Sequence, residues 1–364
     1  MLLVPLPPPA HGSNLMNYYL IKCIQSNNNF CHVIQELHYA NNISDIGTIK
    51  ISKLFKALRY IFLSILHIRS FKPHIIYFVP ALTGIAFLRD FFFSSILKFC
   101  HPVVIYHLHG KGISTNRSKL LYNVIYKRFF RNTYIIQLSK LLFYDIKKYV
   151  HRRSCFFIPN GIPGPHFRPE TQNTVASKYP TILFLSNLIP AKGPLVLLEA
   201  CRILKDKGIE FSAHFVGNPS KEISSTFFEM AIRNYGLENF AKYLGPKYGE
   251  EKHEELRHAD ILAFPTEKDC FPLVLLEAMA HYLPVVATNE GAIPQIVQDG
   301  RTGFIIRKNN PLDLAEKLEI LINSPEIAKK MGLLGYFKFS NMYTMDHFCN
   351  NIVITFQHIY NLHY

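Results

Sequence analysis

Short apolar runs alternate with amphipathic stretches along the chain. In the first half, runs suited to buried strands lie at residues 2–6, 74–79, 103–107 and 134–138. In the second half they lie at residues 181–185, 211–216, 261–264 and 284–288. Helical patterns separate them, among them residues 194–206, 222–235, 250–258 and 272–282. Strands that alternate with helices are typical of parallel sheets covered on both faces. The pattern therefore predicts an α/β chain with two doubly wound, Rossmann-like domains.

A proline- and glycine-rich stretch divides the two series. Residues 158–165 read "IPNGIPGP", and the polar segment 168–180 that follows is the best candidate for a linker. We therefore predict an N-terminal domain at 1–165, a C-terminal domain at 166–345 and a final helix at 346–364 that packs back on the first domain. Ligands of such sheets lie outside the carboxyl ends of the strands, so the site is expected in a cleft between these edges.

Three features of the sequence indicate the cellular compartment of the protein: its N-terminus, its apolar segments and its cysteines. "MLLVPLPPPAHG" has no basic region ahead of its apolar run and makes a poor signal peptide. The most apolar segment, 81–99, holds Arg89 and Asp90 at its centre, which predicts a buried helix rather than a membrane span. The seven cysteines show no C-x-x-C spacing and form no zinc pattern with the histidines. We expect buried free thiols and a cytoplasmic protein.

The charge of the chain is unevenly distributed. The net charge is +14, and residues 1–165 hold 20 Lys and Arg against 4 Asp and Glu. An anionic partner of the first half is expected: nucleic acid, an anionic membrane face or a phosphorylated acceptor. Segments 54–71 and 126–132 combine basic and aromatic residues, which suits peripheral binding to the anionic inner face of a membrane. A solvated basic surface, with 54–71 as a core helix, is the alternative.

Residues 269–280, "DCFPLVLLEAMA", place a carboxylate inside an apolar helix. Pro272 suits the first position of a helix, and the N–H groups of Leu273 and Val274 have no partner within it. Such a helix start binds phosphate. Glu277 lies about 7–8 Å further along the axis, at about 1.5 Å per residue, where it would accept hydrogen bonds from a ribose diol. The alternative is a surface acid that only stabilises the helix dipole.

The same stretch resembles the signature of the retaining, nucleotide-sugar-dependent glycosyltransferases of family 4, which have the GT-B fold. That signature is an acid, seven residues, a glutamate and Ala-Met-Ala, as at 269–280. Other segments resemble family motifs in the same order. They are "PPPAHGS" (7–13), "HLHG" (107–110), "IPNGI" (158–162), "FLSNLIPAKGPLVLLEA" (184–200) and "LPVVATNEGAIPQIVQDGRTGFII" (283–306).

The resemblance implies roles for particular residues. Glu277 would bind the ribose, and Asp269 would contact a hydroxyl group of the donor sugar. Lys192 would bind the donor diphosphate, and His109 would face the sugar near the reacting centre. Each of these residues also has a purely structural interpretation, such as a solvated loop lysine or a histidine at the edge of the core.

Further positions qualify the resemblance. Gly12 and Ser13 would let the backbone approach donor or acceptor closely. The family usually has Glu at the position of Asp269, so Asp269, which is one methylene shorter, would reach a different hydroxyl group or need help from Glu267. It often has Arg at the position of Asn187, so one of two cations on the leaving diphosphate is absent.

The resemblance implies glycosyl transfer with retention at the anomeric carbon. The donor would be a nucleoside-diphosphate sugar, and the acceptor a glycan or a lipid-diphosphate-linked sugar in surface polysaccharide biosynthesis. No cofactor beyond the donor substrate, no metal site and no nucleic-acid partner are expected. The alternatives are a sugar-nucleotide epimerase or hydrolase on the same scaffold, a transferase that no longer turns over, and a non-catalytic basic nucleic-acid-binding protein.

Overall fold

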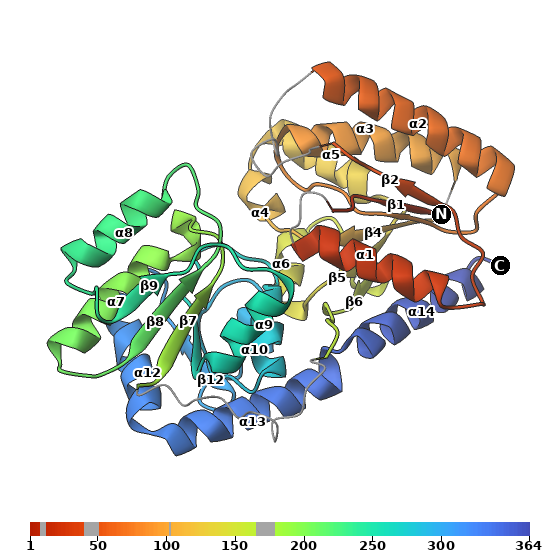
Figure 1. Cartoon of the computed structure of the whole chain (residues 1–364). Helices are drawn as coiled ribbons and strands as arrows, with labels where there is room; N and C mark the ends of the chain where they lie inside the picture. The colour runs from red at the N-terminus through yellow and green to blue at the C-terminus, as the bar shows by residue number, and fades with distance from the viewer. Residues whose placement is uncertain (8–11, 40–50, 102, 165–178) are drawn as a thin grey trace. The chain divides into compact units, whose positions relative to one another are not determined.

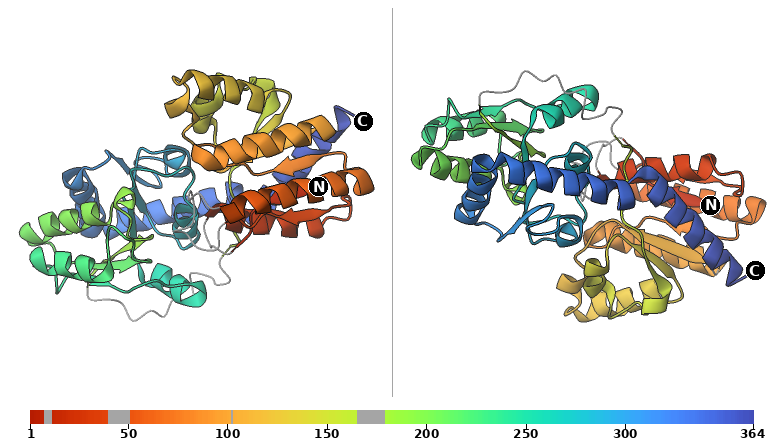
Figure 2. Two further views of the ribbon diagram at one scale, coloured as in Figure 1. Left: turned by 90° about the horizontal axis from the view of Figure 1, so that it is seen from above. Right: turned by 90° about the horizontal axis from the view of Figure 1, so that it is seen from below.

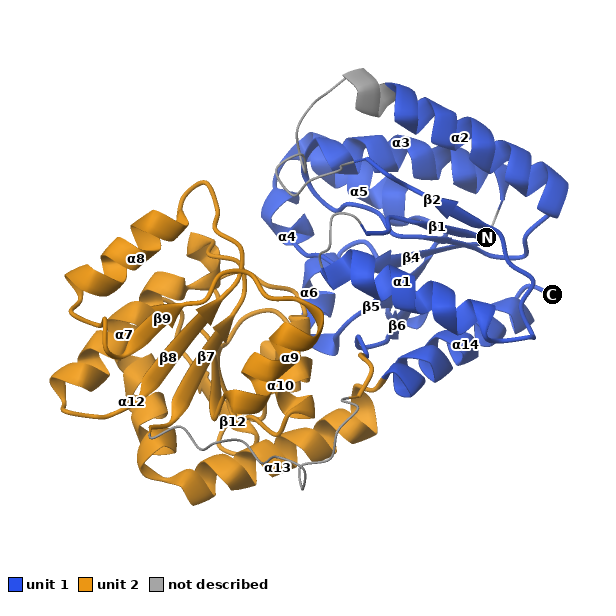
Figure 3. Cartoon of the chain, viewed as in Figure 1, with its two compact units in different colours: residues 1–161, 345–364 blue, residues 162–344 orange. Residues whose placement is uncertain are grey.

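The chain forms two compact units, which are described separately. The computed structural model describes residues 1–7, 12–39, 51–101, 103–164 and 179–364 (Figure 1). Unit 1 comprises Met1–Gly161 together with Met345–Tyr364, and unit 2 comprises Ile162–Thr344 (Figure 3). Each unit contains a parallel six-stranded sheet with helices on both faces. The predicted α/β class with two Rossmann-like domains is confirmed. Most of the predicted linker, at 168–178, lies outside the described residues.

The sheet of unit 1 has the strand order β2-β1-β3-β4-β5-β6. All of its pairings are parallel, and the strands between the two edges are almost fully buried, as apolar runs in parallel sheets should be. Its strands are β1 (Leu2–Val4), β2 (Ile34–Glu36), β3 (Ile76–Phe78), β4 (Val104–Leu108), β5 (Tyr134–Gln137) and β6 (Cys155–Phe157). Strands β2 and β6, at the two edges, were not predicted.

The helices of unit 1 lie in two groups. Helices α2 (Ile51–Phe71), α3 (Gly84–Cys100) and α5 (Leu120–Phe130) pack side by side on one face of the sheet. Helix α14 (Met345–Asn361) lies along α1 (Gly12–Gln25) on the other face (Figure 2). The short helices α4 (Ile113–Asn116) and α6 (Phe143–Ile146) follow β4 and β5. Right-handed crossovers require this division, because β1 connects to β2 in one direction along the sheet and the later strands follow in the other.

A disulfide joins the two helices of the second group. It links Cys23 in α1 to Cys349 in α14, which are 326 residues apart in the sequence. Cys31 and Cys100 are exposed, whereas Cys155 and Cys201 are buried thiols. The prediction of seven buried free thiols is therefore wrong, because cysteine spacing along the chain does not show which helices fold against each other.

Helix α3 is buried on one face only. Phe87, Phe93 and Leu97 belong to the core, but Phe92 and Phe99 on the opposite face are exposed. The prediction of a fully buried helix at 81–99 is wrong in this respect, because uniform apolar character hides the exposed face. The buried Asp90 accepts hydrogen bonds from the Arg89 guanidinium (2.7 Å) and from the Ala81 amide (2.8 Å). No helix among the described residues is long and apolar enough to cross a membrane.

Unit 2 has the strand order β12-β11-β10-β7-β8-β9, and again every pairing is parallel. Its strands are β7 (Thr181–Leu185), β8 (Ser212–Val216), β9 (Ala241–Tyr243), β10 (Ile261–Phe264), β11 (Val285–Thr288) and β12 (Gly303–Ile306). Its main helices are α7 (Pro194–Asp206), α8 (Ser225–Asn234), α9 (Gly249–His258), α10 (Leu273–Ala280), α12 (Pro311–Asn323) and α13 (Pro325–Met342). The short helix α11 (Ile293–Ile296) joins β11 to β12. The four predicted strands of this half are all present, whereas β9 and β12 at the two edges were not predicted.

The two faces of this sheet are covered by different helices. Helices α7 and α12 pack against each other on one face, and α10 packs against α13. The core on the α7 side includes Phe184, Phe215 and Phe228, all fully buried. This packing fixes the ends of β7, β10 and β11, from which the candidate site is built.

Candidate functional site

The candidate site lies where three neighbouring strands of unit 2 end. The chain leaves β7 toward Asn187 and Lys192, leaves β10 toward Asp269, and leaves β11 toward Glu290. Since β7, β10 and β11 are adjacent and parallel, these turns come together at the carboxyl edge of one sheet. This edge is where doubly wound sheets bind their ligands.

The turn with Lys192 is locked to the turn that follows β10. Gly193 has a φ of 78°, and a Cβ added there would lie 2.2 Å from the carbonyl oxygen of Pro265. Only glycine fits such a left-handed residue with so close a neighbour. The Ala191 carbonyl accepts hydrogen bonds from the Glu267 amide (2.8 Å) and from the Thr266 hydroxyl (3.0 Å). These contacts hold the Lys192 side chain beside the loop that carries Asp269.

Lys192 and Asp269 form an ion pair. The Lys192 Nζ lies 2.5 Å from the Asp269 Oδ2, and both side chains are largely buried. The other carboxylate oxygen of Asp269 accepts a hydrogen bond from the Cys270 amide at 2.8 Å. The two residues that the resemblance assigns to the donor diphosphate and the donor sugar are therefore in direct contact. An anionic ligand that binds Lys192 has to share it with Asp269.

Glu290 holds the backbone of Asp269 in place and was not among the site residues predicted from the sequence. Its side chain is 5% exposed, its Oε1 accepts a hydrogen bond from the Asp269 amide (3.2 Å), and its Oε2 pairs with the Lys308 ammonium. The next residue, Gly291, has a φ of 53°, and a Cβ there would lie 2.6 Å from the Asp269 carbonyl oxygen. The loops after β10 and β11 are thus packed backbone against backbone. An acid directly after a buried strand, as in "ATNEG", is the signal that would have identified Glu290.

Helix α10 begins one residue later than predicted. Pro272 is its N-cap, with an extended backbone, and Leu273 is the first helical residue. The prediction that Pro272 opens the helix is therefore wrong by one position. Leu273 and Val274 are half-buried in the first turn, where amide groups lack partners within the helix. This helix start lies directly after the loop with Asp269, as phosphate binding would require.

Glu277 is engaged by a lysine that the sequence did not indicate. Its Oε1 lies 2.8 Å from the Nζ of Lys252 in α9, and its side chain is 15% exposed. The Glu277 backbone carbonyl lies 2.7 Å from the His281 Nδ1, and the His281 Nε2 lies 3.3 Å from the His253 Nδ1. Burial lowers the pKa of His281 to about 4, so this ring is neutral near pH 7. The predicted ribose ligand is therefore a half-buried carboxylate held between two helices.

Asn187 belongs to an uncharged network. Its Oδ1 accepts hydrogen bonds from the Asn218 amide (3.3 Å) and from the Asn218 Nδ2 (3.2 Å). The Asn218 Nδ2 also donates to the Tyr248 hydroxyl at 2.7 Å. Position 187 thus contributes amide and hydroxyl groups to this edge instead of the cation that the family often has there.

The other predicted site residues belong to unit 1. His109 lies just after β4, beside His107, with their ring centroids 4.1 Å apart. His107 is buried, its Nδ1 lies 2.5 Å from the Tyr77 hydroxyl, and burial holds its pKa well below the usual value. Gly12 and Ser13 open helix α1, which Asn17 ties to the carboxyl end of β1 through the Pro5 carbonyl (2.8 Å). These residues therefore lie at the carboxyl edge of the first sheet, whereas the charged pairs above lie at the edge of the second.

Groups of three or more His, Cys, Asp or Glu residues placed to hold a metal ion were not found in the described part of the chain. The acids of the candidate site are instead paired with lysines: Asp269 with Lys192, Glu277 with Lys252 and Glu290 with Lys308. Three lysines at one sheet edge can bind an anionic ligand, provided that each is released or shared by its carboxylate.

Comparison with known proteins finds a family model that matches part of the chain. Residues 168–335 match the family model of glycosyl transferases group 1. The D-inositol 3-phosphate glycosyltransferase of Paenarthrobacter aurescens is 33% identical over 158 residues, which is 42% of this chain and 38% of that protein. Other curated relatives are likewise matched over about two fifths of their own length. The sequence similarity to these relatives thus covers less than half of the chain.

Solved structures show the same fold over the whole chain. Sucrose-phosphate synthase from Thermosynechococcus elongatus superposes with a TM-score of 0.75 at 15% identity and full coverage of both chains. The Anabaena protein HepE, in a complex with UDP-glucose, superposes with a TM-score of 0.74 at 18% identity, over 98% of this chain and 99% of HepE. The architecture is therefore that of GT-B proteins, with two Rossmann-like domains.

Proposed function

We propose that the protein is a glycosyltransferase that takes its sugar from a nucleoside-diphosphate sugar and transfers it with retention of the anomeric configuration. The observation that carries the proposal is the arrangement at the carboxyl edge of unit 2. There the Lys192–Asp269 ion pair precedes α10 and Glu277 lies in its second turn, inside the segment that matches the glycosyl transferases group 1 model. The UDP-glucose complex of HepE makes UDP-sugars the first donors to test.

The chemistry follows from the charges at this edge. Departure of the nucleoside diphosphate builds negative charge on the β-phosphate, and preorganised donors that stabilise this charge usually supply the largest catalytic effect. Lys192 and the first-turn amides of Leu273 and Val274 fill this role. Since Asn187 brings no positive charge, Lys192 is the main cation for the diphosphate, and Asp269 orients it in the absence of donor.

The remaining residues position the two sugars. Glu277 accepts hydrogen bonds from the ribose through the carboxylate oxygen that Lys252 does not engage. Asp269 holds a hydroxyl group of the donor sugar, and we assign to His109, Gly12 and Ser13 the roles that the family resemblance implies for them. The acceptor hydroxyl attacks the face from which the diphosphate leaves, and the leaving phosphate takes its proton, which retains the configuration.

A screen of nucleoside-diphosphate sugars by thermal shift, followed by transfer assays, tests the proposal. Glu277→Ala should weaken donor binding by about tenfold or more, since a hydrogen bond to a charged group contributes about 1.5–3 kcal/mol. Glu316→Ala, an exposed glutamate in α12, is the matched control and should bind as the wild type does. Proton NMR of the product reports the anomeric configuration. Free sugar or isomerised nucleotide without an acceptor would favour the epimerase or hydrolase instead, and binding without turnover would favour a degenerate transferase.

We further propose that unit 1 binds the anionic inner face of a membrane, where a lipid-linked acceptor for surface polysaccharide would be presented. The outer sides of α2, α3 and α5 carry exposed apolar residues: Phe55, Leu58, Phe62, Leu66, Ile85, Phe92, Phe99, Leu120, Leu121 and Val124. The three helices contain a single acidic residue, Asp90, which is buried and paired. Basic side chains around exposed apolar residues are what an anionic bilayer attracts.

Vesicle sedimentation tests this surface. Phe62→Glu together with Phe92→Glu should abolish binding to vesicles that contain phosphatidylglycerol, because two charges would enter the apolar region. Phe337→Glu in α13 changes a similarly exposed phenylalanine outside this surface and should leave binding unchanged. Equal binding to neutral and anionic vesicles would contradict the role of the basic residues, and preferential binding to nucleic acid would support the non-enzymatic alternative.

A further inference from the structure

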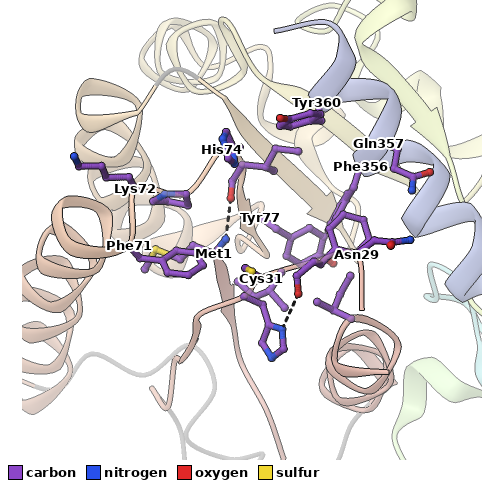
Figure 4. Close-up of a pocket in the computed structure, with 16 residues that line it drawn as sticks. Met1, Asn29, Cys31, Phe71, Lys72, His74, Tyr77, Phe356, Gln357 and Tyr360 are labelled. Atoms are coloured by element: carbon purple, nitrogen blue, oxygen red, sulfur yellow. Dashed lines mark hydrogen bonds between the residues drawn. The ribbon is translucent and has the colours of Figure 1, made fainter. Parts of the chain in front are cut away.

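Unit 1 contains a cavity that lies away from the predicted site residues of that unit. Its volume is about 530 Å³, and it is found at the opposite end of the sheet from His109, where β1 and β3 begin (Figure 4). The end of α2, the segment after α1 and one side of α14 complete its walls. The size falls within the range of about 300–1,000 Å³ that is usual for small-molecule sites.

The walls of the cavity are mainly apolar and aromatic. Phe30, Phe71, Tyr77 and Phe356 contribute rings, and Phe356 makes an edge contact with Phe30 (centroids 6.2 Å) and a tilted contact with Tyr77 (5.8 Å). Rings that pack against one another hold the wall in place. Apolar and aromatic walls of this kind are typical of sites that bind apolar molecules. The interior therefore suits a hydrocarbon chain.

The polar lining residues include basic side chains but no acidic ones. Lys72, His32 and His74 lie around the cavity, and none of the lining residues is Asp or Glu. Lys72 directly follows α2 in a left-handed conformation that is common at helix ends, with a φ of 48°, and its amide donates to the Ile68 carbonyl at 3.1 Å. An anionic group at this rim would therefore not be repelled by any acidic side chain among the lining residues.

We propose that this cavity binds a single hydrocarbon chain that carries an anionic head group. The chain lies among the rings of Phe30, Phe71, Tyr77 and Phe356, and the head group lies beside Lys72 and the two histidines. Phe71 is also the last residue of α2, whose outer side is the apolar surface described above. The ligand is therefore a free amphiphile or a lipid drawn from a bilayer, and both share this chemistry. The proposal does not depend on the transferase activity or on the donor site.

The protein contains a cysteine that can report whether the cavity is occupied. Cys31 lines the cavity and has an exposed thiol, while Cys100 is exposed elsewhere on unit 1 and is the matched control. The wild-type protein, without reductant, is alkylated with N-ethylmaleimide, and the rate at each cysteine is followed by peptide mass spectrometry. At ten times its dissociation constant, monomeric dodecanoate should slow alkylation of Cys31 about tenfold and leave Cys100 unchanged. An unchanged rate at Cys31, or equal slowing at both cysteines, would overturn the proposal.

Two comparisons test the parts of the ligand separately. Affinity should rise up to about fourfold for each methylene from octanoate to dodecanoate, because each buried methylene contributes the same increment. Dodecylammonium has the same chain with a cationic head and should protect Cys31 far less than dodecanoate does. Protection that is independent of chain length would overturn the proposal that the hydrocarbon chain lies in the interior of the cavity. Equal protection by dodecylammonium would overturn the proposal that the rim binds an anionic head group.

A charge reversal and a vesicle experiment complete the test. Lys72→Glu should weaken protection by dodecanoate, whereas Lys22→Glu, at an exposed position of α1 outside the cavity, should not. Equal effects of the two substitutions would remove Lys72 from the site. Stronger protection by phosphatidylglycerol vesicles than by monomeric dodecanoate identifies a bilayer lipid as the ligand, and the reverse order identifies a free amphiphile.

Discussion

The pair formed by Glu290 and Lys308 offers a direct test of how the loop with Asp269 is held. Glu290 is 4% exposed and accepts the Asp269 amide hydrogen through one oxygen, while its other oxygen pairs with Lys308. Replacing Glu290 by Gln keeps the size of the side chain but removes its charge. An amide nitrogen would then face either the Asp269 N–H or the Lys308 ammonium, and both are hydrogen-bond donors.

The expected magnitude follows from the burial of the two partners. Removing one member of a fully buried ion pair costs about 3–5 kcal/mol, whereas exposed pairs contribute about 0.2–1 kcal/mol. The Glu290 side chain is 5% exposed and that of Lys308 is 40% exposed, so the pair lies between these limits. We expect a coupling energy of about 1–2 kcal/mol between the two side chains.

A double-mutant cycle measures this coupling. Glu290→Gln, Lys308→Met and the double variant are unfolded in urea and followed by circular dichroism, and free energies are compared only if the slopes agree. The single variants should each lose stability, and the double variant should lose less than their sum. Donor affinity should fall in Glu290→Gln as well, because Asp269 loses its support. Additive effects within about 0.5 kcal/mol would refute the pair as a support of the site.

Three further predictions concern other contacts. Burial lowers the pKa of His281 from 6.5 to about 4, which favours the folded state by about 3 kcal/mol at and above pH 6.5. This contribution should be lost as the pH falls from 6.5 to 4. His281→Gln should therefore flatten that part of the plot of unfolding free energy against pH. Gly193→Ala should cost at least about 1–2 kcal/mol in urea unfolding and weaken donor binding, because the new Cβ meets the Pro265 carbonyl; unchanged stability would contradict the close approach of these two turns. Thiol titration of the denatured, unreduced protein should find five reactive groups, and reduction of Cys23–Cys349 should lower stability by about 2–5 kcal/mol; seven groups before reduction would exclude the disulfide.

The sequence predicts the buried strands of both sheets but not the strands at their edges. Strands such as β4 and β7 are covered on both faces, so they appear as unbroken apolar runs. Strands β2 and β9 have a single strand neighbour and only three residues each, and they mix polar with apolar side chains. Their identity depends on the neighbouring strand that they join, which no local pattern reveals.

The candidate site is likewise only partly predictable from the sequence. Asp269 and Glu277 are separated by a fixed number of residues on one loop and helix, so their proximity to the start of α10 could be predicted. The partners of these acids come from distant segments: Lys192 from the turn after β7, and Lys252 from α9. A lysine on a polar helix such as α9 looks like an ordinary surface residue until the fold brings it against the acid.

The central claim is that a nucleoside-diphosphate sugar binds at the carboxyl edge of unit 2. Hydrogen–deuterium exchange of the whole protein, with and without the donor selected by the screen, tests it most directly. The amides of 187–193 and 269–277 should be protected by the donor, and Glu277→Ala should lose most of this protection at the same donor concentration. Protection confined to unit 1, or unaffected by Glu277→Ala, would contradict the account.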